Sequence, residues 1–119
     1  MTFFENLLKK DNDIDIQEFL NKLDEEDDGM YDNADAFVKP IPLNEDTDLD
    51  AIMVESKAGN IVLLDIQSLL RRNALKLKTL VNELRQRVES IDGDIARISE
   101  EKIIVTPHRV KIYKKRSLL

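Results

Sequence analysis

The fold is decided by residues 60–98, NIVLLDIQSLLRRNALKLKTLVNELRQRVESIDGDIARI. The segment opens with a nearly unbroken apolar run over residues 60–66, which is typical of a central strand covered on at least one face. Apolar side chains then recur at alternating spacings of four and three residues, as along one face of an amphipathic helix: Leu70, Ala74, Leu77, Val81, Leu84, Val88 and Ile91. This pattern predicts one helix of about 22 residues, which Asp92 and Gly93 end.

A strand and a helix are expected before this segment. Residues 37–41, FVKPI, have strand composition, and Pro40 indicates an edge or a strand-end position because proline has no N–H to donate. Asn44 or Thr47 can cap the next helix, and Thr47 opens a capping-box-like pattern. Gly59 ends that helix. The spacing of strand, helix and strand predicts a βαβ crossover.

After the long helix, three short strands are expected at residues 94–98, 102–106 and 110–113. The element order is then βαβαβββ, with two helices on one sheet. This is an α+β fold, a two-layer α/β sandwich, over a core domain of residues 36–113 with a basic and apolar tail at 114–119. In so small a domain, one sheet face and part of the long helix can lack cover, which a second copy would supply.

The composition limits the function classes. The chain has 119 residues, 42% apolar and 35% charged, which fits one domain. It has no Cys, which excludes a disulfide framework, a thiolate nucleophile and a Cys-based zinc site. No apolar run approaches the roughly 20 residues of a membrane span, and the first ten residues do not resemble a secretory signal. We therefore expect a cytoplasmic protein.

The acidity of the chain belongs to its first 34 residues. They carry 11 acidic and 3 basic side chains, a net charge of −8, whereas residues 35–119 have a net charge of +2. The acidic run at residues 24–28 lacks the alternating ligands and central Gly of a calcium loop. Because like charges repel, we expect residues 11–35 to form an acidic flexible linker.

The first ten residues have the pattern of a short amphipathic helix. Such a helix can lie in the headgroup layer of a membrane, with two lysines near its C-terminal end meeting anionic lipid. Its candidate membrane-binding side chains are Phe3, Phe4, Leu7, Leu8, Lys9 and Lys10. The alternatives are a disordered start and a helix that docks on the core of the same chain.

A second apolar cluster over residues 14–23 can extend that helix or form a separate one. Acidic residues flank it, including Asp13, Asp15 and Glu18, and an anionic surface would repel them by roughly 1 kcal/mol per charge. The predicted membrane-targeting segment is therefore confined to residues 1–10.

No catalytic or ligand-binding constellation is found in the sequence. His108 is the only His and lies in a predicted turn, and none of the three Gly residues cluster into a phosphate-binding loop. We expect no catalytic residue, no metal site, no cofactor and no small-molecule substrate.

The basic face of the long helix suggests a different class, a small nucleic-acid-binding module. Glu83 and Glu89 dilute that face, and it has no aromatic side chain on which a base could stack. A solvated helix face is the default interpretation, and nucleic acid is the alternative rather than the expected partner.

Residues 36–113 resemble the SepF family of cell-division proteins, in the shorter archaeal form. Three stretches carry the resemblance, in this order and spacing: VKPIPL at 38–43, SKAGNIVLLDI at 56–66, and GDIARI at 93–98 followed by KIIVTP at 102–107. An amphipathic start joined by a charged linker also matches the layout of the family.

The resemblance implies a homodimer that tethers the C-terminal tail of the tubulin-like protein FtsZ to the cytoplasmic membrane at the division site, without catalysis. It also implies partner-binding roles for Arg97, which would meet carboxylates or carbonyls, and for Ile103, which would cover an apolar side chain. The alternative for Ile103 is a plain core residue. The bacterial turn glycine has no counterpart at residues 88–91, so assembly beyond a dimer is doubtful. The dimer interface, sheet or long helix, stays open.

Overall fold

The computed structural model describes residues 15–25 and 31–114. The chain divides into two compact units, Met1–Ala34 and Asp35–Leu119. The membrane-targeting segment expected at residues 1–10 lies outside the described residues.

The first unit contains short helices. One covers residues 15–22, and the 3-10 helix η1 covers Tyr31–Asn33. The apolar side chains of the first helix and of the turn after it are all exposed: Ile16, Phe19, Leu20 and Leu23. The second apolar cluster of the sequence is therefore helical over most of its length, with an apolar face that no described residue covers.

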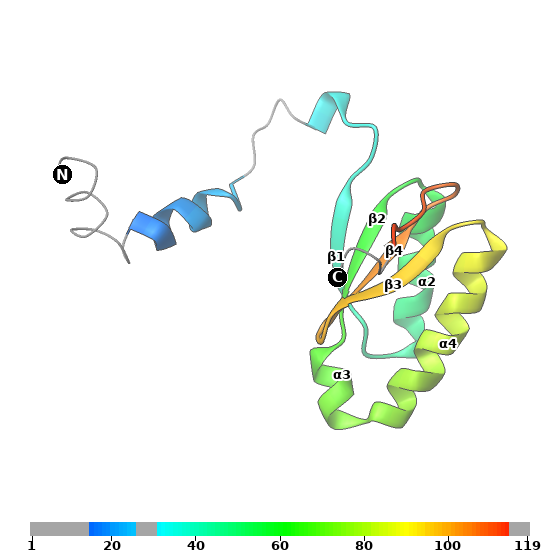
Figure 1. Ribbon diagram of the computed structural model, residues 1–119. Coiled ribbons are helices and arrows are strands. Elements are labelled where there is room, and N and C mark those ends of the chain that lie inside the picture. The colour runs from blue at the N-terminus through cyan, green and yellow to red at the C-terminus, as the bar shows by residue number, and fades with distance from the viewer. Residues whose placement is uncertain (1–14, 26–30, 115–119) are drawn as a thin grey trace. The chain divides into compact units, whose positions relative to one another are not determined.

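The second unit is a four-stranded sheet with helices on one face (Figure 1). Its elements are β1 (Val38–Pro42), α2 (Asp46–Lys57), β2 (Ile61–Asp65), α3 (Gln67–Arg72), α4 (Ala74–Ser90), β3 (Asp94–Ser99) and β4 (Lys102–Thr106). The strand order is β1-β2-β4-β3, in which β1 and β2 are parallel and the other two pairs are antiparallel. The predicted α+β two-layer sandwich is confirmed.

The core lies between the two central strands and the helices. Val62 pairs with Val105 and Leu64 with Ile103, so these four side chains share one face of the sheet, and none is more than 6% exposed. The buried helix side chains that cover them are Leu49, Ile52, Met53, Leu69, Leu77, Leu80, Leu84 and Val88. Removing this apolar surface from water is the main force that holds the two layers together.

Strand β1 lies at an edge of the sheet, as Pro40 predicts. The carbonyl of Phe37 and the N–H of Leu43 both bond to the backbone of the β2 region, at 2.9 and 3.0 Å. Since alternate residues of a strand direct their backbone groups to opposite sides, Pro40 and Pro42 occupy positions that face away from β2. The outer edge of β1 therefore lacks two N–H donors.

The N-cap of helix α2 lies between the two predicted caps. Its N-cap is Glu45, and the carboxylate of Asp48 accepts hydrogen bonds from the backbone N–H groups of Asn44 and Glu45, at 2.8 and 2.9 Å. The expected caps at Asn44 or Thr47 were wrong because Asp48 satisfies these orphan donors from inside the first turn. Gly59, at a φ of 95°, follows the helix end as predicted.

The predicted single long helix is wrong, because Asn73 breaks it into α3 and α4. Asn73 has extended backbone angles, φ −158° and ψ 85°, and its side chain accepts a hydrogen bond from the N–H of Lys76 at 3.1 Å. It thereby caps α4. The break also changes which side chains are buried: Leu69 is fully buried, whereas Leu70 is 37% exposed.

The predicted strand at residues 110–113 is also wrong, since this segment forms no strand. Arg109 has a positive φ of 63°, which turns the chain after β4. The N–H of Ile112 then donates to the carboxylate of Asp94 at 2.9 Å. The side chain of Asp94 thus accepts the backbone hydrogen bond that a neighbouring strand would have accepted. With this strand absent and the long helix divided, the βαβαβββ order becomes βαβααββ.

Candidate functional site

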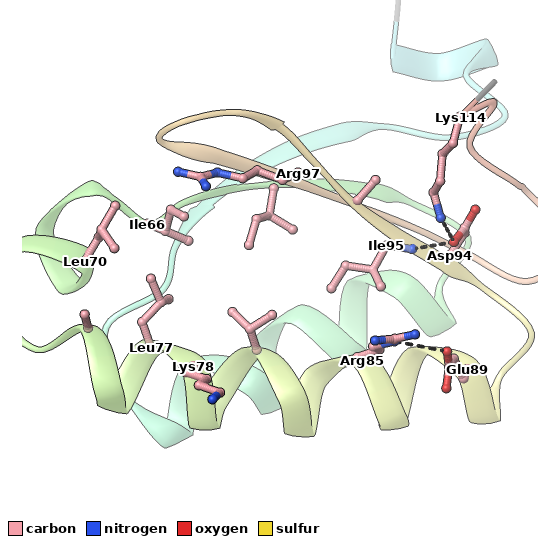
Figure 2. Close-up of a pocket in the computed structure, with 14 residues that line it drawn as sticks. Ile66, Leu70, Leu77, Lys78, Arg85, Glu89, Asp94, Ile95, Arg97 and Lys114 are labelled. Carbon is pink, nitrogen blue, oxygen red and sulfur yellow. Dashed lines mark hydrogen bonds and ion pairs between the residues drawn. The ribbon is translucent and has the colours of Figure 1, made fainter. Parts of the chain in front are cut away.

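A groove of about 530 Å³ lies between the helices and the β3–β4 side of the sheet, and we call it the edge groove (Figure 2). Its apolar lining comes from Ile66, Leu70, Ala74, Leu77, Val81, Ile95, Ala96 and Ile103. Its charged lining comes from Lys78, Arg85, Glu89, Asp94, Arg97 and Lys114. An apolar floor with a charged rim is an arrangement that suits a short peptide segment.

The edge groove exists because β3 is the last strand on its side of the sheet in the described residues. The first three residues of β3 are half-buried and the last three are exposed. Ile95 pairs with Val105 and Arg97 with Ile103, so Ile95 and Arg97 lie on the helix face of the sheet. With no further strand beyond β3, the space between this face and α4 opens to solvent.

Arg97 is held at the rim by the turn that joins β3 to β4. Its Nε donates to the carbonyl oxygen of Ser99 at 2.9 Å, and its Nη2 donates to the carbonyl oxygen of Glu100. A guanidinium has five N–H donors, so these two bonds orient the group and leave other donors for a ligand. Arg97 therefore meets the requirement for a fixed contact with carboxylate or carbonyl oxygens.

Ile103 is a core residue that also lines the edge groove. It is 6% exposed and belongs to the main hydrophobic cluster, and it is part of the groove wall. The two interpretations of Ile103 are therefore compatible. The structure places it directly across the strand pair from Arg97, so the two residues singled out by the family resemblance lie side by side.

The charged rim has an excess of positive charge. Arg85 pairs with Glu89 at 3.4 Å and Lys114 pairs with Asp94 at 2.7 Å. Lys78 and Arg97 form no ion pair within the described residues. The groove therefore favours a segment with negative charge next to an apolar side chain.

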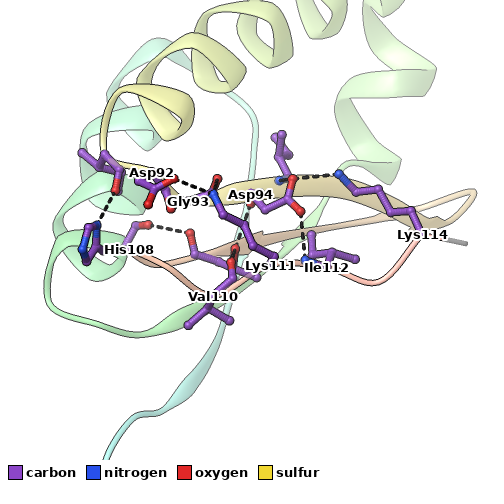
Figure 3. A network of polar contacts seen from close by, with 12 residues as sticks. Asp92, Gly93, Asp94, His108, Val110, Lys111, Ile112 and Lys114 are labelled. Atoms are coloured by element: carbon purple, nitrogen blue, oxygen red, sulfur yellow. Dashed lines mark hydrogen bonds and ion pairs between the residues drawn. The ribbon is translucent and has the colours of Figure 1, made fainter.

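Asp94 ties the segment after β4 to one end of the edge groove (Figure 3). Its carboxylate accepts hydrogen bonds from Lys114 Nζ at 2.7 Å, from the N–H of Ile112 at 2.9 Å and from the N–H of Ile95 at 2.8 Å. Partial burial disfavours the charged form of Asp94, but these hydrogen bonds outweigh it and lower the pKa from 3.8 to about 2. The ionised carboxylate thus holds Ile112 and Lys114, whereas Lys111 is held separately by the carboxylate of Asp92.

Acid should remove this contribution to stability. Because the folded pKa of Asp94 is below the unfolded one, its stabilisation is fully present above about pH 4 and is lost as pH falls towards about 2. We expect Asp94→Asn to lower the free energy of unfolding by about 1–2 kcal/mol at pH 7, as measured by urea denaturation. The difference from the parent should shrink between pH 4 and pH 2.5, and a constant difference would contradict this assignment.

Other sequence expectations can be located in the structure. His108 is exposed, with Nδ1 3.2 Å from the carbonyl oxygen of Ile91. Within residues 15–25 and 31–114, no group of three or more His, Asp or Glu could hold a metal ion, and no helix is long and apolar enough to cross a bilayer. The predicted membrane-binding residues lie outside the described part of the chain.

Sequence reasoning missed most of the edge groove. It placed Leu70 and Val81 in a buried stripe and Lys78 and Arg85 on a solvated face, and it left Lys114 in the tail. The structure brings all five to the groove. The available signal was the small size of the domain, in which part of the long helix can lack cover.

Comparisons with known proteins agree on one family. A family model described as cell division protein SepF matches residues 38–112. A SepF-like protein from Archaeoglobus fulgidus is 30% identical, with a TM-score of 0.60 over 68% of this chain and 99% of that one. A SepF-like protein from Pyrococcus furiosus is also 30% identical, with a TM-score of 0.63 over 67% of this chain and 96% of that one. No curated protein matches the chain.

Proposed function

Because the chain belongs to the SepF family of cell-division proteins, we propose that it is a non-enzymatic adaptor that tethers the FtsZ C-terminal tail to the cytoplasmic membrane at the division site. The observation that supports this proposal best is the edge groove, where Arg97 and Ile103 lie across one strand pair above an apolar floor.

The tail would bind through an apolar anchor and a charged contact. An apolar side chain of the tail enters the groove between Leu77 of α4 and Ile103 of β4, where it is removed from water. Arg97 and Lys78 then meet carboxylate or carbonyl oxygens of the same segment. Burial of the anchor supplies affinity, and the oriented guanidinium fixes the position of the tail.

The membrane end of the adaptor is the amphipathic segment at residues 1–10. Phe3, Phe4, Leu7 and Leu8 enter the headgroup boundary, and Lys9 and Lys10 contact anionic lipid. The protein would then be peripheral on the inner face of the membrane, and residues 11–35 would link the anchor to the sheet domain.

The experiment that tests both ends is co-flotation. A labelled FtsZ tail peptide is mixed with anionic vesicles, with and without the full chain, and the vesicles are floated through a density step. The proposal requires the peptide to float only when the chain is present.

The proposal includes a homodimer formed through the free face of the sheet. Pro40, Leu63, Ile104 and Ala96 lie in one row across the four strands, on the face opposite the buried core. All four are half-buried or exposed, and the helices of this unit, α2, α3 and α4, cover only the other face (Figure 1). Such an apolar row suits a self-complementary contact. The exposed side of α4 is charged, which favours the sheet over the long helix as the interface.

Ile104→Glu should convert this dimer to a monomer, because it places a charge in the middle of an apolar contact. Sedimentation measures the mass of the parent and the variant at the same concentration. The control is Val54→Glu, which makes the same kind of change at an exposed apolar residue of α2 and should stay dimeric. A dimeric Ile104→Glu would exclude the sheet face as the interface.

A further inference from the structure

The turn between α3 and α4 forms a surface whose residues have no role in the edge groove, and we call it the basic corner. It consists of Arg71, Arg72, Leu75 and Lys76, none of which lines the groove. Asn73 fixes its shape by capping α4 through the N–H of Lys76. Figure 1 shows α3 and α4 meeting there at the lower end of the domain.

The basic corner combines free positive charge with an exposed apolar side chain. Leu75 is 74% exposed, and Arg71 and Arg72 are exposed as well. Within the described residues, none of the three cations of the corner forms an ion pair. The sequence has no acidic residue from Gln67 to Asn82, a stretch that carries four basic ones. A ligand with negative charge beside an apolar phase would satisfy both features at once.

An anionic lipid surface fits this description better than a nucleic acid does. A base needs an aromatic face on which to stack, and residues 66–82 contain none. A leucine that projects between arginines can instead enter the acyl boundary while the guanidinium groups meet lipid phosphates. We infer that the basic corner is a second membrane-contact surface, which binds anionic lipid independently of residues 1–10.

The position of the basic corner in the domain determines how a membrane contact there would orient the domain. Strands β1 and β2 are parallel and α3 follows the end of β2, so the corner is at the opposite end of the sheet from the residues that precede β1. A contact at the corner would therefore fix the domain on the membrane in one orientation. Two weak contacts joined by a linker also bind more tightly than either one alone.

The test uses the full chain with Phe4→Glu, which removes the proposed anchor, at low ionic strength where charges are little screened. The probe is a vesicle of equal parts phosphatidylglycerol and phosphatidylcholine, compared with phosphatidylcholine alone. Phe4→Glu should still bind the anionic vesicle above the neutral one. Adding Arg71→Gln and Arg72→Gln should weaken this binding about 25-fold, since each basic side chain near such a surface is worth about fivefold.

Leu75→Glu in the same background should weaken binding by at least about tenfold, through the loss of a buried apolar side chain. Val54→Glu is the matched control, since Val54 is an apolar side chain 64% exposed on α2, and it should bind as its parent does. Circular dichroism verifies that each variant is folded.

Three outcomes overturn the inference: the Phe4→Glu chain shows no preference for the anionic vesicle, the changes at Arg71, Arg72 and Leu75 leave vesicle binding unchanged, or Val54→Glu reduces vesicle binding equally. In the second case, a loss of binding to duplex DNA in the same variants makes the corner a nucleic-acid surface instead. The inference rests on the proposed function only because both place the protein at the same membrane. Failure of the anchor is a separate result: Phe4→Glu would then bind as tightly as the parent chain.

Discussion

Arg97→Glu is expected to weaken the binding of the FtsZ tail peptide by about thirtyfold, which corresponds to about 2 kcal/mol. The parent guanidinium is oriented by the carbonyl oxygens of Ser99 and Glu100, so its remaining donors are aligned before the peptide arrives. A carboxylate in its place loses these contacts and repels acidic groups of the peptide. Calorimetry with the full chain measures the change.

The matched control is Lys57→Glu, which reverses a charge at the end of α2, away from the edge groove, and should bind as the parent does. Arg97→Lys keeps the charge but loses the planar fork, so it should fall between the two. If Arg97→Glu binds the peptide as tightly as Lys57→Glu, the binding site is not the edge groove.

A test of the apolar contact in the edge groove needs a substitution at a residue other than Ile103. Since Ile103 is part of the core, Ile103→Ala would lower stability as well as affinity. Leu70 lines the groove while 37% exposed, so Leu70→Ala can weaken peptide binding with little effect on folding. The affinity of Leu70→Ala for the peptide measures the apolar contribution to binding, and the affinity of Arg97→Glu measures the charged one.

Phe4→Glu should abolish co-flotation of the FtsZ peptide with anionic vesicles at physiological salt. Burial of one aromatic side chain contributes about 2 kcal/mol, and the new carboxylate adds repulsion from anionic headgroups, so binding should fall by at least about thirtyfold. Calorimetry with the peptide in solution should be unchanged, because the variant leaves the edge groove intact.

Asn6→Glu is the control for this change. It adds the same negative charge but lies off the stripe formed by Phe3, Phe4, Leu7 and Leu8, so most of the flotation should remain. Equal flotation of Phe4→Glu and the parent would contradict the anchor at residues 1–10.

The strands were predictable where short apolar runs are bounded by turn residues. Strand β4 has the expected bounds, β3 extends one residue further than expected, and β1 and β2 differ by one residue at each end. The helix break at Asn73 was not predicted, because the spacing of Leu70, Ala74 and Leu77 continues across it. Periodicity counts residues and does not detect a single extended residue that serves as a cap.

The missing third strand has a non-local cause. Residues 110–113 alternate as a strand does, but the chain turns at Arg109 and Asp94 captures the N–H of Ile112. A carboxylate 18 residues earlier in the chain decides this outcome. The same limit applies to the edge groove, since its walls come from α3, α4, β3, β4 and residue 114, and these come together only in the folded chain.

The two prolines of β1 set a limit on how the protein can aggregate. At the membrane, the proposed adaptor would reach a high local concentration, at which exposed strand edges tend to join into fibrils. Pro40 and Pro42 remove two backbone N–H donors from the outer edge of β1, so another strand cannot pair with it in a regular ladder. The sheet is therefore closed to a further strand on the β1 side, and any extension would have to occur at β3.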